Sequence, residues 1–417
     1  MSIASVARAS LSTMKILHTS DWHIGRAFHS NPTIANLRIV FDALVTAVRE
    51  YDVDVVLVSG DIFDSATPAA ENFDVLSEVL ANIRAAGARV ILTSGNHDSA
   101  PRLGFTAAFT GLAGVHIFTS AELLDQPVSI NDAYGPVHFY GIPYLEPALV
   151  RHQFAAQNPV TSLNTHEQVL AHAMNRIRLD LAGRRGRSVV LAHAFIADIP
   201  ASVTLSEHGR ADAGEPSTGG LERDITSGGL DLVPLETFDG PDYVALGHIH
   251  GRTILSERAR YSGAPLHYSF GEAQKARGAW LVKLDSVGLD TVEWIGFPVP
   301  RRLTVLTGDL EDLLASAENS EFAEDWISAI LTDRVRPMDA MRRLQSRFSH
   351  AAALEHRPKV VADPGAQSYA TRIATRTDHE IVDGFLELVR NGVGASDAER
   401  AIIAAAISEG TSRSQGL

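Results

Sequence analysis

The chain has 417 residues, a formal net charge of −14 and no cysteine, with 45% hydrophobic and 21% charged residues. This length allows two or three domains with full hydrophobic cores. The lack of cysteine excludes disulfide frameworks, thiolate metal sites and cysteine nucleophiles, and it fits a reducing cytoplasm, where we expect the protein to act. No stretch approaches the roughly 18–20 apolar residues of a membrane span, so we expect no membrane partner. The acidic balance argues against a broad basic face for nucleic acid.

The first part of the chain alternates predicted strands with amphipathic helices. Residues 1–13 lack a continuous apolar core, and we expect a disordered extension there. Apolar runs and helical spacing then predict strand, helix, strand, helix and strand at Lys15–Ser20, Asn31–Glu50, Val53–Ser59, Ala69–Ala86 and Arg89–Thr93. This order predicts an α/β domain, in which ligands gather beyond the carboxyl ends of the strands.

From Gly114 onward, shorter strands indicate a second sheet packed on the first. The predicted elements are the strands Val137–Tyr140, Ser188–Ala192 and Asp242–Gly251, a helix over Leu163–Leu181, and a closing hairpin of Trp280–Leu284 with Thr291–Phe297. Residues 198–230 are rich in Gly, Ser, Asp and Glu. A connection of this length inside a compact domain is usually functional or mobile.

A new series of predicted strands and helices begins near Pro298. The following elements are predicted strands at Leu303–Leu306, Trp326–Leu331 and Ala351–Glu355, with helices at Leu310–Ala315 and Pro337–Phe348. We therefore expect a main domain over 14–297, a small α/β domain over 298–362, a polar linker over 363–378 and C-terminal helices over 379–417. Two helices bury little apolar surface alone, so we expect them to dock on a partner.

Polar side chains with metal-ligand chemistry follow five predicted strands. They are Asp21 and His23, then Asp61, then Asn96, His97 and Asp98, then His193, and finally His248 and His250. Each one alone has an ordinary explanation, because an aspartate at a strand end is often a turn or helix cap and a single histidine is often part of a core. Their joint occurrence at five strand ends indicates one site.

The residue types indicate the chemistry of that site. Carboxylate, amide and imidazole donors without sulfur suit Mg²⁺, Mn²⁺, Fe or Zn²⁺. Without His97 and Asp98, seven candidate ligands remain. Seven are too many for one ion with an open position, but they suit two ions about 3.5–4 Å apart that share a carboxylate, for which Asp61 is the candidate. Two such ions favour phosphoester hydrolysis. His97 is the candidate general acid, oriented by Asp98, although a structural histidine is the alternative.

The motifs DWH (21–23), GDIFD (60–64), GNHD (95–98) and GHIH (247–250), with His193, resemble the signature of calcineurin-like metallophosphoesterases. HTSDWHIGR, GNHDS, GGLERDI with SGGLDLVP, DYVALGHIH and YSGAPLHYSFGE further resemble the SbcD family of bacterial nuclease subunits. The resemblance implies a two-sheet core flanked by helices and two ions, with Mn²⁺ as the activating metal. It implies one ion held by Asp21, His23, Asp61 and His250, and the other by Asp61, Asn96, His193 and His248.

The same resemblance implies partners and an activity. It implies a homodimer bound to an SbcC-type coiled-coil ATPase of the SMC class in a heterotetramer. The activity it implies is ATP-dependent exonuclease action on double-stranded DNA ends and endonuclease action on hairpins, in DNA repair and recombination. The alternatives are a small-molecule or cyclic-nucleotide phosphoesterase on the same core, or a non-catalytic scaffold. The small α/β unit argues against the first of these, and the intact ligand set argues against the second.

Three basic clusters are candidate contacts to DNA that would offset the acidic balance, although solvated surface is the commoner explanation for each. They are Arg184–Arg187, Arg301-Arg302 and Arg342-Arg343.

Overall fold

The computed structural model of the chain describes residues 13–157, 163–198, 232–359, 376–390 and 392–414. Contacts divide the chain into two compact units, Met1–Pro300 and Arg301–Leu417. Residues 1–12 of the predicted extension, most of the predicted linker 363–378 and the Gly-rich segment 199–231 lie outside the described residues.

The first unit is built on two mixed sheets, each with six strands in the described ranges. The first sheet has the order β16 (Leu289–Gly296), β15 (Gly278–Leu284), β1 (Met14–Thr19), β4 (Val55–Ser59), β5 (Arg89–Thr93), β6 (Val115–Phe118). The second sheet has the order β13 (Thr253–Ile254), β14 (Ala259–Tyr261), β12 (Tyr243–Gly247), β9 (Arg187–His193), β8 (Gly135–Ile142), β7 (Val128–Asp132).

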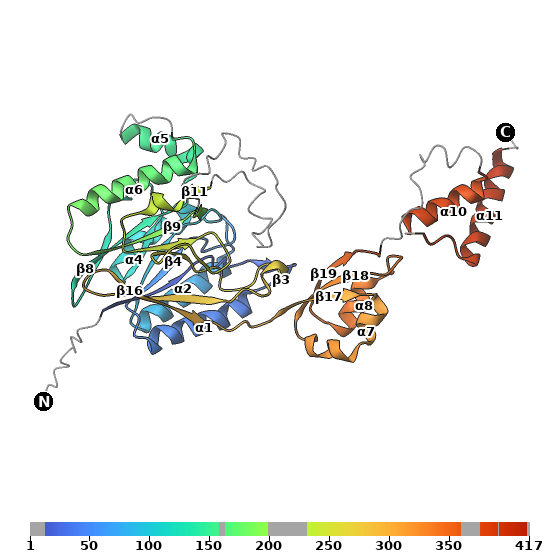
Figure 1. The fold of residues 1–417 in the computed structure, drawn as a ribbon, viewed down its shortest axis with the longest axis horizontal. Coiled ribbons are helices and arrows are strands. Elements are labelled where there is room, and N and C mark those ends of the chain that lie inside the picture. Colours follow the sequence, from blue (N-terminus) through green and yellow to red (C-terminus); the bar gives the residue numbers. More distant parts are fainter. Residues whose placement is uncertain (1–12, 158–162, 199–231, 360–375, 391, 415–417) are drawn as a thin grey trace. The chain divides into compact units, whose positions relative to one another are not determined.

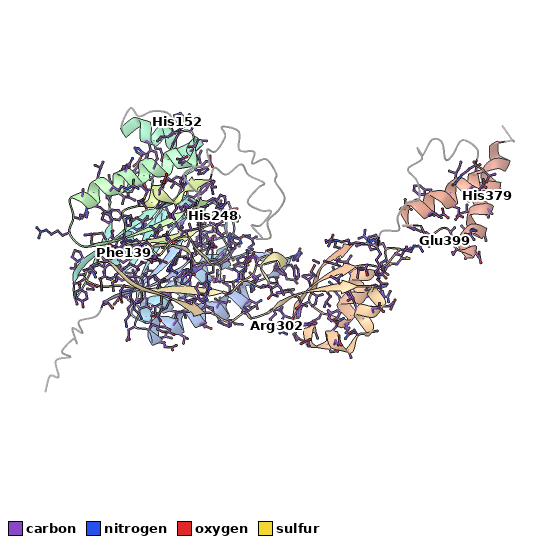
Figure 2. The ribbon with its side chains drawn as sticks, viewed as in Figure 1. Phe139, His152, His248, Arg302, His379 and Glu399 are labelled. Atoms are coloured by element: carbon purple, nitrogen blue, oxygen red, sulfur yellow. The ribbon has the colours of Figure 1, made fainter. Side chains whose placement is uncertain are left out.

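Helices cover the outer face of each sheet, and the inner faces pack on each other (Figure 1). Helices α1 (Ile34–Glu50) and α2 (Ala70–Ala85) cover the first sheet, and α5 (Pro147–Gln157) and α6 (His166–Ala182) cover the second. Side chains alternate along β4, so that Val56 and Val58 face the helices while Val55 and Leu57 join the layer between the sheets. Phe139, labelled in Figure 2, lies in that middle layer. The expected two-sheet α/β core flanked by helices is confirmed.

The strand directions bring the predicted site residues to one end of this sandwich. Strands β1, β4 and β5 are parallel neighbours in the first sheet, as are β9 and β12 in the second. Polar bonds hold the two sheets together near that end. The Ser59 hydroxyl donates to the carbonyl oxygen of Ala245 at 2.9 Å, and the ring of His18 contacts Tyr243 and Leu246.

Several predicted helix boundaries were wrong for identifiable reasons. Residues 31–33 do not join α1, because Asn31–Pro32 form a short strand, β3, paired with β2 (Ala27–Phe28). Helix α6 begins after Thr165, which forms a capping box with Gln168. Helix α8 (Ala340–Arg347) begins three residues later than expected, because Asp339 before it is left-handed, with φ of 50°.

The second unit contains the predicted small α/β fold. Its strands β17 (Leu303–Gly308), β18 (Trp326–Leu331) and β19 (Ala351–His356) form a parallel sheet, and its core includes side chains of α7 (Leu310–Ala315) and α8. Helices α10 (Asp378–Val389) and α11 (Asp397–Ser414) follow.

The structure changes the interpretation of the three basic clusters. Arg187 is not a surface residue, since it is buried and paired with Asp132 at 2.6 Å. Five other arginines of these clusters form ion pairs with carboxylates: Arg184 with Asp180, Arg301 with Glu324, Arg302 with Asp325, Arg342 with Asp339, and Arg343 with Glu311. Carboxylates of the same chain therefore offset most of the charge of these clusters.

Candidate metal centre

The predicted ligand residues meet at the carboxyl ends of strands from both sheets. Asp21 and His23 follow β1, Asp61 follows β4, Asn96 follows β5, His193 ends β9, and His248 and His250 follow β12. His248 is labelled in Figure 2. Residues from distant parts of the chain thus converge because parallel strands end at the same edge.

Asp61 lies at the centre of the group. Its Oδ2 is 3.6 Å from Nε2 of His23 and 3.4 Å from Nε2 of His193. Its Oδ1 instead accepts the backbone N–H of His97 at 2.9 Å. One oxygen is held by the backbone while the other lies between two histidines, which is the position that a carboxylate shared by two ions requires.

The first group of potential ligands comprises Asp21, His23 and His250, whose ligand atoms all lie within 4.8 Å of one another. The Nε2 atoms of His23 and His250 are 3.1 Å apart. Asp21 also accepts the backbone N–H of His248 at 3.0 Å, which ties the loop after β12 to the loop after β1.

The second group surrounds the Asn96 amide. Its Oδ1 is 3.0 Å from Nε2 of His193 and 3.1 Å from Nδ1 of His248. Asn96 is exposed and His248 is partly exposed, whereas Asp61 and His193 are buried. The group therefore has a buried floor and a side that substrate can reach.

The residues present fit divalent cations. In three histidines Nδ1 faces away from the centre and lies close to an oxygen atom. The distances are 2.9 Å from His193 Nδ1 to the carbonyl oxygen of Ser59, 3.2 Å from His23 Nδ1 to Asp64 Oδ1, and 3.6 Å from His250 Nδ1 to Glu272 Oε1. Such oxygens orient metal-binding histidines and leave Nε2 toward the ion. The donors are carboxylate, amide and imidazole, as Mg²⁺, Mn²⁺, Fe or Zn²⁺ require.

The charge of Asp61 strongly affects the pKa values of the histidines around it. Burial alone would raise the pKa of Asp61, but the imidazoles of His193 and His23 lower it below its usual range. Burial would lower the pKa of His193, but Asp61 raises it to about 9. Burial and the neighbouring His193 lower the pKa of His248 to about 4. A proton on His193 thus balances Asp61, and a bound divalent cation would replace that proton.

Strained backbone conformations cluster at this site. Asp21, His23, Asp61 and His248 have positive φ values of 52°, 45°, 47° and 102°. Non-glycine residues adopt such angles only where the surrounding structure holds them, and this happens most often at functional sites. Gly60 is required beside them, because its φ is 82° and a Cβ there would lie 2.2 Å from Nδ1 of His193.

His97 is placed beside the centre with one fixed ring nitrogen. Its Nδ1 is 3.0 Å from the carbonyl oxygen of Asp64, which can only accept, so Nδ1 carries a proton. The ring meets that of His23 edge-on, with centroids 4.9 Å apart. Nε2 is then available to hold the proton that a general acid transfers.

Among the described residues, the hydrogen bonds of Asp98 go to backbone N–H groups and not to the His97 ring that the sequence suggested it orients. Its Oδ1 accepts the N–H of Phe63 at 2.8 Å, and its Oδ2 accepts those of Ile62 at 3.0 Å and Gly95 at 2.9 Å. These bonds join the loop after β4 to the loop after β5. Burial and the charge of Asp61 raise the pKa of Asp98 to about 6. The hydrogen bonds therefore give Asp98 a loop-connecting role, and the backbone of Asp64 contacts the His97 ring instead.

Sequence reasoning missed Glu272 as a functional candidate. Besides lying near His250, its buried carboxylate forms an ion pair with Arg277 and accepts the hydroxyl of Ser269 at 3.1 Å. Arg277 also donates to the carbonyl oxygen of His250. In the sequence, Glu272 stood out only as the last residue of the segment YSGAPLHYSFGE. The spacing of residues in that segment does not by itself indicate a metal site.

A cavity of about 700 Å³ opens beside the Asn96 group. Its lining includes Ser94, Asn96, Tyr144 and Glu146. The ring of Tyr144 lies 6.4 Å from that of His193, and burial followed by the charge of Glu146 raises the pKa of Tyr144 to about 12, so the phenol stays neutral. The cavity offers room for the part of a substrate that flanks the reacting bond.

In the described part of the chain, no helix has the length and apolar character needed to cross a membrane.

Fold and site together define a metal-dependent phosphoesterase. Residues 14–252 match the family described as calcineurin-like phosphoesterase, and the chain belongs to that family. Residues 299–390 match a second family, described as the type 5 capsule protein repressor C-terminal domain, with the short name SbcD_C. The expected enzyme class and family resemblance are thereby confirmed.

Two nuclease subunits are similar to the chain over most of its length. The chain is 28% identical over 339 residues to the D subunit of nuclease SbcCD from Escherichia coli K12, covering 80% of this chain and 82% of that protein. The same values hold for the D subunit of nuclease SbcCD from Escherichia coli O157:H7. Among solved structures, TT1561 of Thermus thermophilus is 12% identical, with a TM-score of 0.38, covering 68% of this chain and 99% of that one.

Proposed function

We propose that this protein is the nuclease component of a DNA-processing complex, with two Mn²⁺ ions as its cofactors. The observation that carries the proposal is the position of Asp61 Oδ2 between His23 and His193, on a chain similar to the D subunit of nuclease SbcCD over most of both lengths. Asp21, His23, Asp61 and His250 hold one ion, and Asp61, Asn96, His193 and His248 hold the other.

Two such ions, when bound, would supply Lewis-acid stabilisation of charge on the attacking and leaving oxygens of a phosphodiester. The residues of the chain position the ions and exclude bulk water from the floor of the site. His97 protonates the leaving oxygen from Nε2, because its Nδ1 is already committed to Asp64 O. Asp98 keeps the loops that carry Asp61 and His97 together through its three backbone hydrogen bonds.

The substrate of this proposal is double-stranded DNA, cut exonucleolytically from its ends in an ATP-dependent reaction and endonucleolytically at hairpins, in repair and recombination. The cellular location is the cytoplasm, consistent with a chain that has no cysteine. The cavity beside Asn96 supports a polymeric substrate, since it extends the site beyond one phosphodiester.

We further propose that the domains are 14–297 for nuclease chemistry, 298–362 as a small domain facing DNA, and 379–417 for docking an SbcC-type coiled-coil ATPase. The change of compact unit between Pro300 and Arg301 supports the first boundary. Exposed apolar side chains of α10 and α11 support docking, with Phe385 at 49%, Val389 at 57% and Ile402 at 69% exposure.

A homodimer within the heterotetramer is part of the same proposal. A short helical segment after β5, formed by α3 (Ala100–Leu103), a 3-10 turn and α4 (Ala107–Leu112), exposes three large apolar side chains. Phe105, Phe109 and Leu112 are 83%, 76% and 89% exposed. Their spacing places them along one face of this segment, and a second copy would remove that face from water.

The test uses the purified chain with Mn²⁺, a linear duplex and a hairpin oligonucleotide, with and without a coiled-coil ATPase. Cutting of both DNA substrates, with ATP-dependent stimulation by the ATPase, is the expected result. Hydrolysis of a small nucleotide ester with no cutting of DNA would instead support the small-molecule phosphoesterase. Truncation after Arg376 should retain Mn²⁺ binding but lose co-purification with the ATPase, and retained co-purification would contradict the docking role.

A further inference from the structure

Two arginines next to the candidate metal centre lie against tryptophan rings. Cζ of Arg252 is 4.9 Å from the ring centre of Trp294 and 5.4 Å from that of Trp280. Cζ of Arg260 is 4.8 Å from the ring centre of Trp280. The two tryptophan rings meet at 70° with centroids 4.9 Å apart. These four residues form an arginine–tryptophan cluster in which aromatic faces hold the guanidinium groups.

The cluster lies toward the same end of the second sheet as the metal ligands. Arg252 follows His250 by two residues and immediately precedes β13, where Thr253 pairs with Tyr261. Tyr261 is the last residue of β14, which runs parallel to β12, and β12 leads directly into His248. Arg252 therefore lies at the carboxyl ends of these strands, at the edge of the sheet that borders the site.

The charge of these arginines is not offset by carboxylates. In this acidic chain many surface arginines pair with aspartate or glutamate, as Arg38 does with Glu78. Within the described ranges neither Arg252 nor Arg260 forms an ion pair with a carboxylate. Among the described residues, the Arg260 side chain donates only to the carbonyl oxygen of Glu257, at 3.3 Å, and its buried Nε atom has no hydrogen-bond partner. Arg252 is exposed.

An aromatic face orients a guanidinium group without using its N–H donors, which remain free for another partner. A guanidinium group whose charge is not neutralised by a carboxylate can donate two parallel N–H hydrogen bonds to two oxygens of one phosphate group. We propose that the arginine–tryptophan cluster binds a backbone phosphate of duplex DNA next to the bond that is cut. This inference rests on the proposed nuclease function and adds the path of the DNA strand, from the metal centre across the β13–β14 edge.

The test measures binding of a fluorescently labelled linear duplex to the full-length protein in chelator, at several salt concentrations. Arg252→Gln should weaken binding roughly tenfold and reduce the salt slope by about one, the value of one lost phosphate contact. Trp294→Leu should weaken binding through Arg252, so its effect should not add to that of Arg252→Gln. The matched control is Arg258→Gln, an exposed arginine before β14 at its other end, and it should change little.

A second measurement separates this inference from the function on which it rests. Hydrolysis of bis(p-nitrophenyl) phosphate with Mn²⁺ should be the same in Arg252→Gln and wild type, because that small ester lacks the neighbouring backbone phosphate that the cluster is proposed to bind. Wild-type cutting of duplex DNA with an unchanged salt slope in Arg252→Gln would overturn this inference alone. No cutting or binding of DNA by the wild type would overturn both. Unchanged DNA binding with lost co-purification of the ATPase would assign the cluster to a protein partner and also overturn the proposal.

Discussion

Oδ2 of Asp61 lies 3.4 Å from Nε2 of His193, although the first residue follows a strand of one sheet and the second ends a strand of the other. This contact exists only because the inner faces of the two sheets pack closely. Nδ1 of His193 lies 2.9 Å from the carbonyl oxygen of Ser59, so both ring nitrogens of this histidine contact residues at the end of β4 in the first sheet. The candidate metal centre is therefore a property of sheet packing as much as of any motif.

The shared position of Asp61 gives the first prediction. Asp61→Asn should weaken both Mn²⁺ ions, because its Oδ2 faces both ligand groups, whereas His250→Ala should chiefly weaken one. Each loss should exceed the roughly 10- to 100-fold effect of removing an outer-shell partner. Calorimetric titration with Mn²⁺ measures the two sites, with His116→Ala as a histidine control on β6. Equal loss of both ions in the two variants would contradict the sharing of Asp61.

The proposed proton-donor role of His97 predicts a dependence on the leaving group. His97→Ala should slow DNA cleavage by about 10²- to 10⁴-fold while Mn²⁺ binding is kept. Hydrolysis of bis(p-nitrophenyl) phosphate should be affected far less, because p-nitrophenolate departs without a proton. Comparing turnover of the two substrates checks this expectation. The same loss on both substrates, or no loss on either, would show that His97 is not the general acid.

The loop-connecting role of Asp98 predicts a loss of stability. Asp98→Ala leaves three backbone N–H groups without their acceptor, so the free energy of unfolding should fall by roughly 2–4 kcal/mol, and Asp98→Asn should recover part of it. Urea unfolding in chelator measures the change, and His97→Ala should leave it nearly unaltered. If Asp98→Ala kept full stability yet lost DNA cleavage as His97→Ala does, the role suggested by the sequence would be restored.

Glu272 should act on one ion through the His250 ring. Glu272→Gln should weaken the ion bound by Asp21, His23 and His250 by roughly 10- to 100-fold, because the ring loses the charge that orients it. Glu272→Asp keeps a charge for the buried Arg277, so it separates orientation of His250 from loss of the ion pair. Mn²⁺ titration and thermal unfolding are measured together, with exposed Glu257→Gln as the control. A stable Glu272→Gln protein with both Mn²⁺ affinities intact would refute this positioning role.

His18 predicts a pH dependence of stability that is separate from the metal ligands. Burial lowers the pKa of His18 to about 3 from 6.5, although the Leu246 carbonyl partly opposes the shift. Between about pH 3 and pH 6.5, His18 binds a proton more readily in the unfolded chain than in the folded protein. The contribution of neutral His18 to the free energy of unfolding is therefore complete above pH 6.5 and is lost as the pH falls. At about pH 5 the loss should be roughly 2 kcal/mol.

The check compares urea unfolding of wild type and His18→Gln near neutral pH and at about pH 5. The variant should lack this component of the pH dependence, because glutamine does not titrate. His152→Gln, at an exposed histidine labelled in Figure 2, should behave as wild type. An identical pH dependence in His18→Gln and wild type would show that His18 does not resist protonation in the folded protein.

The sequence alone indicated the central strands of both sheets and the kinds of candidate ligand. Apolar runs such as those of β5 and β18 were predicted with the bounds that the structure has, because a buried strand must present apolar residues on both faces. The residues after β1, β4, β5, β9 and β12 could be proposed as metal ligands by chemistry, because carboxylates, amides and imidazoles without sulfur suit few cofactors. The family resemblance rested on the same short motifs.

Only the tertiary structure decided which groups meet. The partners of Asp98 are backbone N–H groups of two loops, and backbone amides have no signature in a sequence. The burial of Arg187, the approach of Glu272 to His250 and the contact of Arg252 with two tryptophans all join segments far apart in the chain. Local patterns specify which face of an element is buried, whereas the pairing of distant side chains depends on how the two sheets pack on each other.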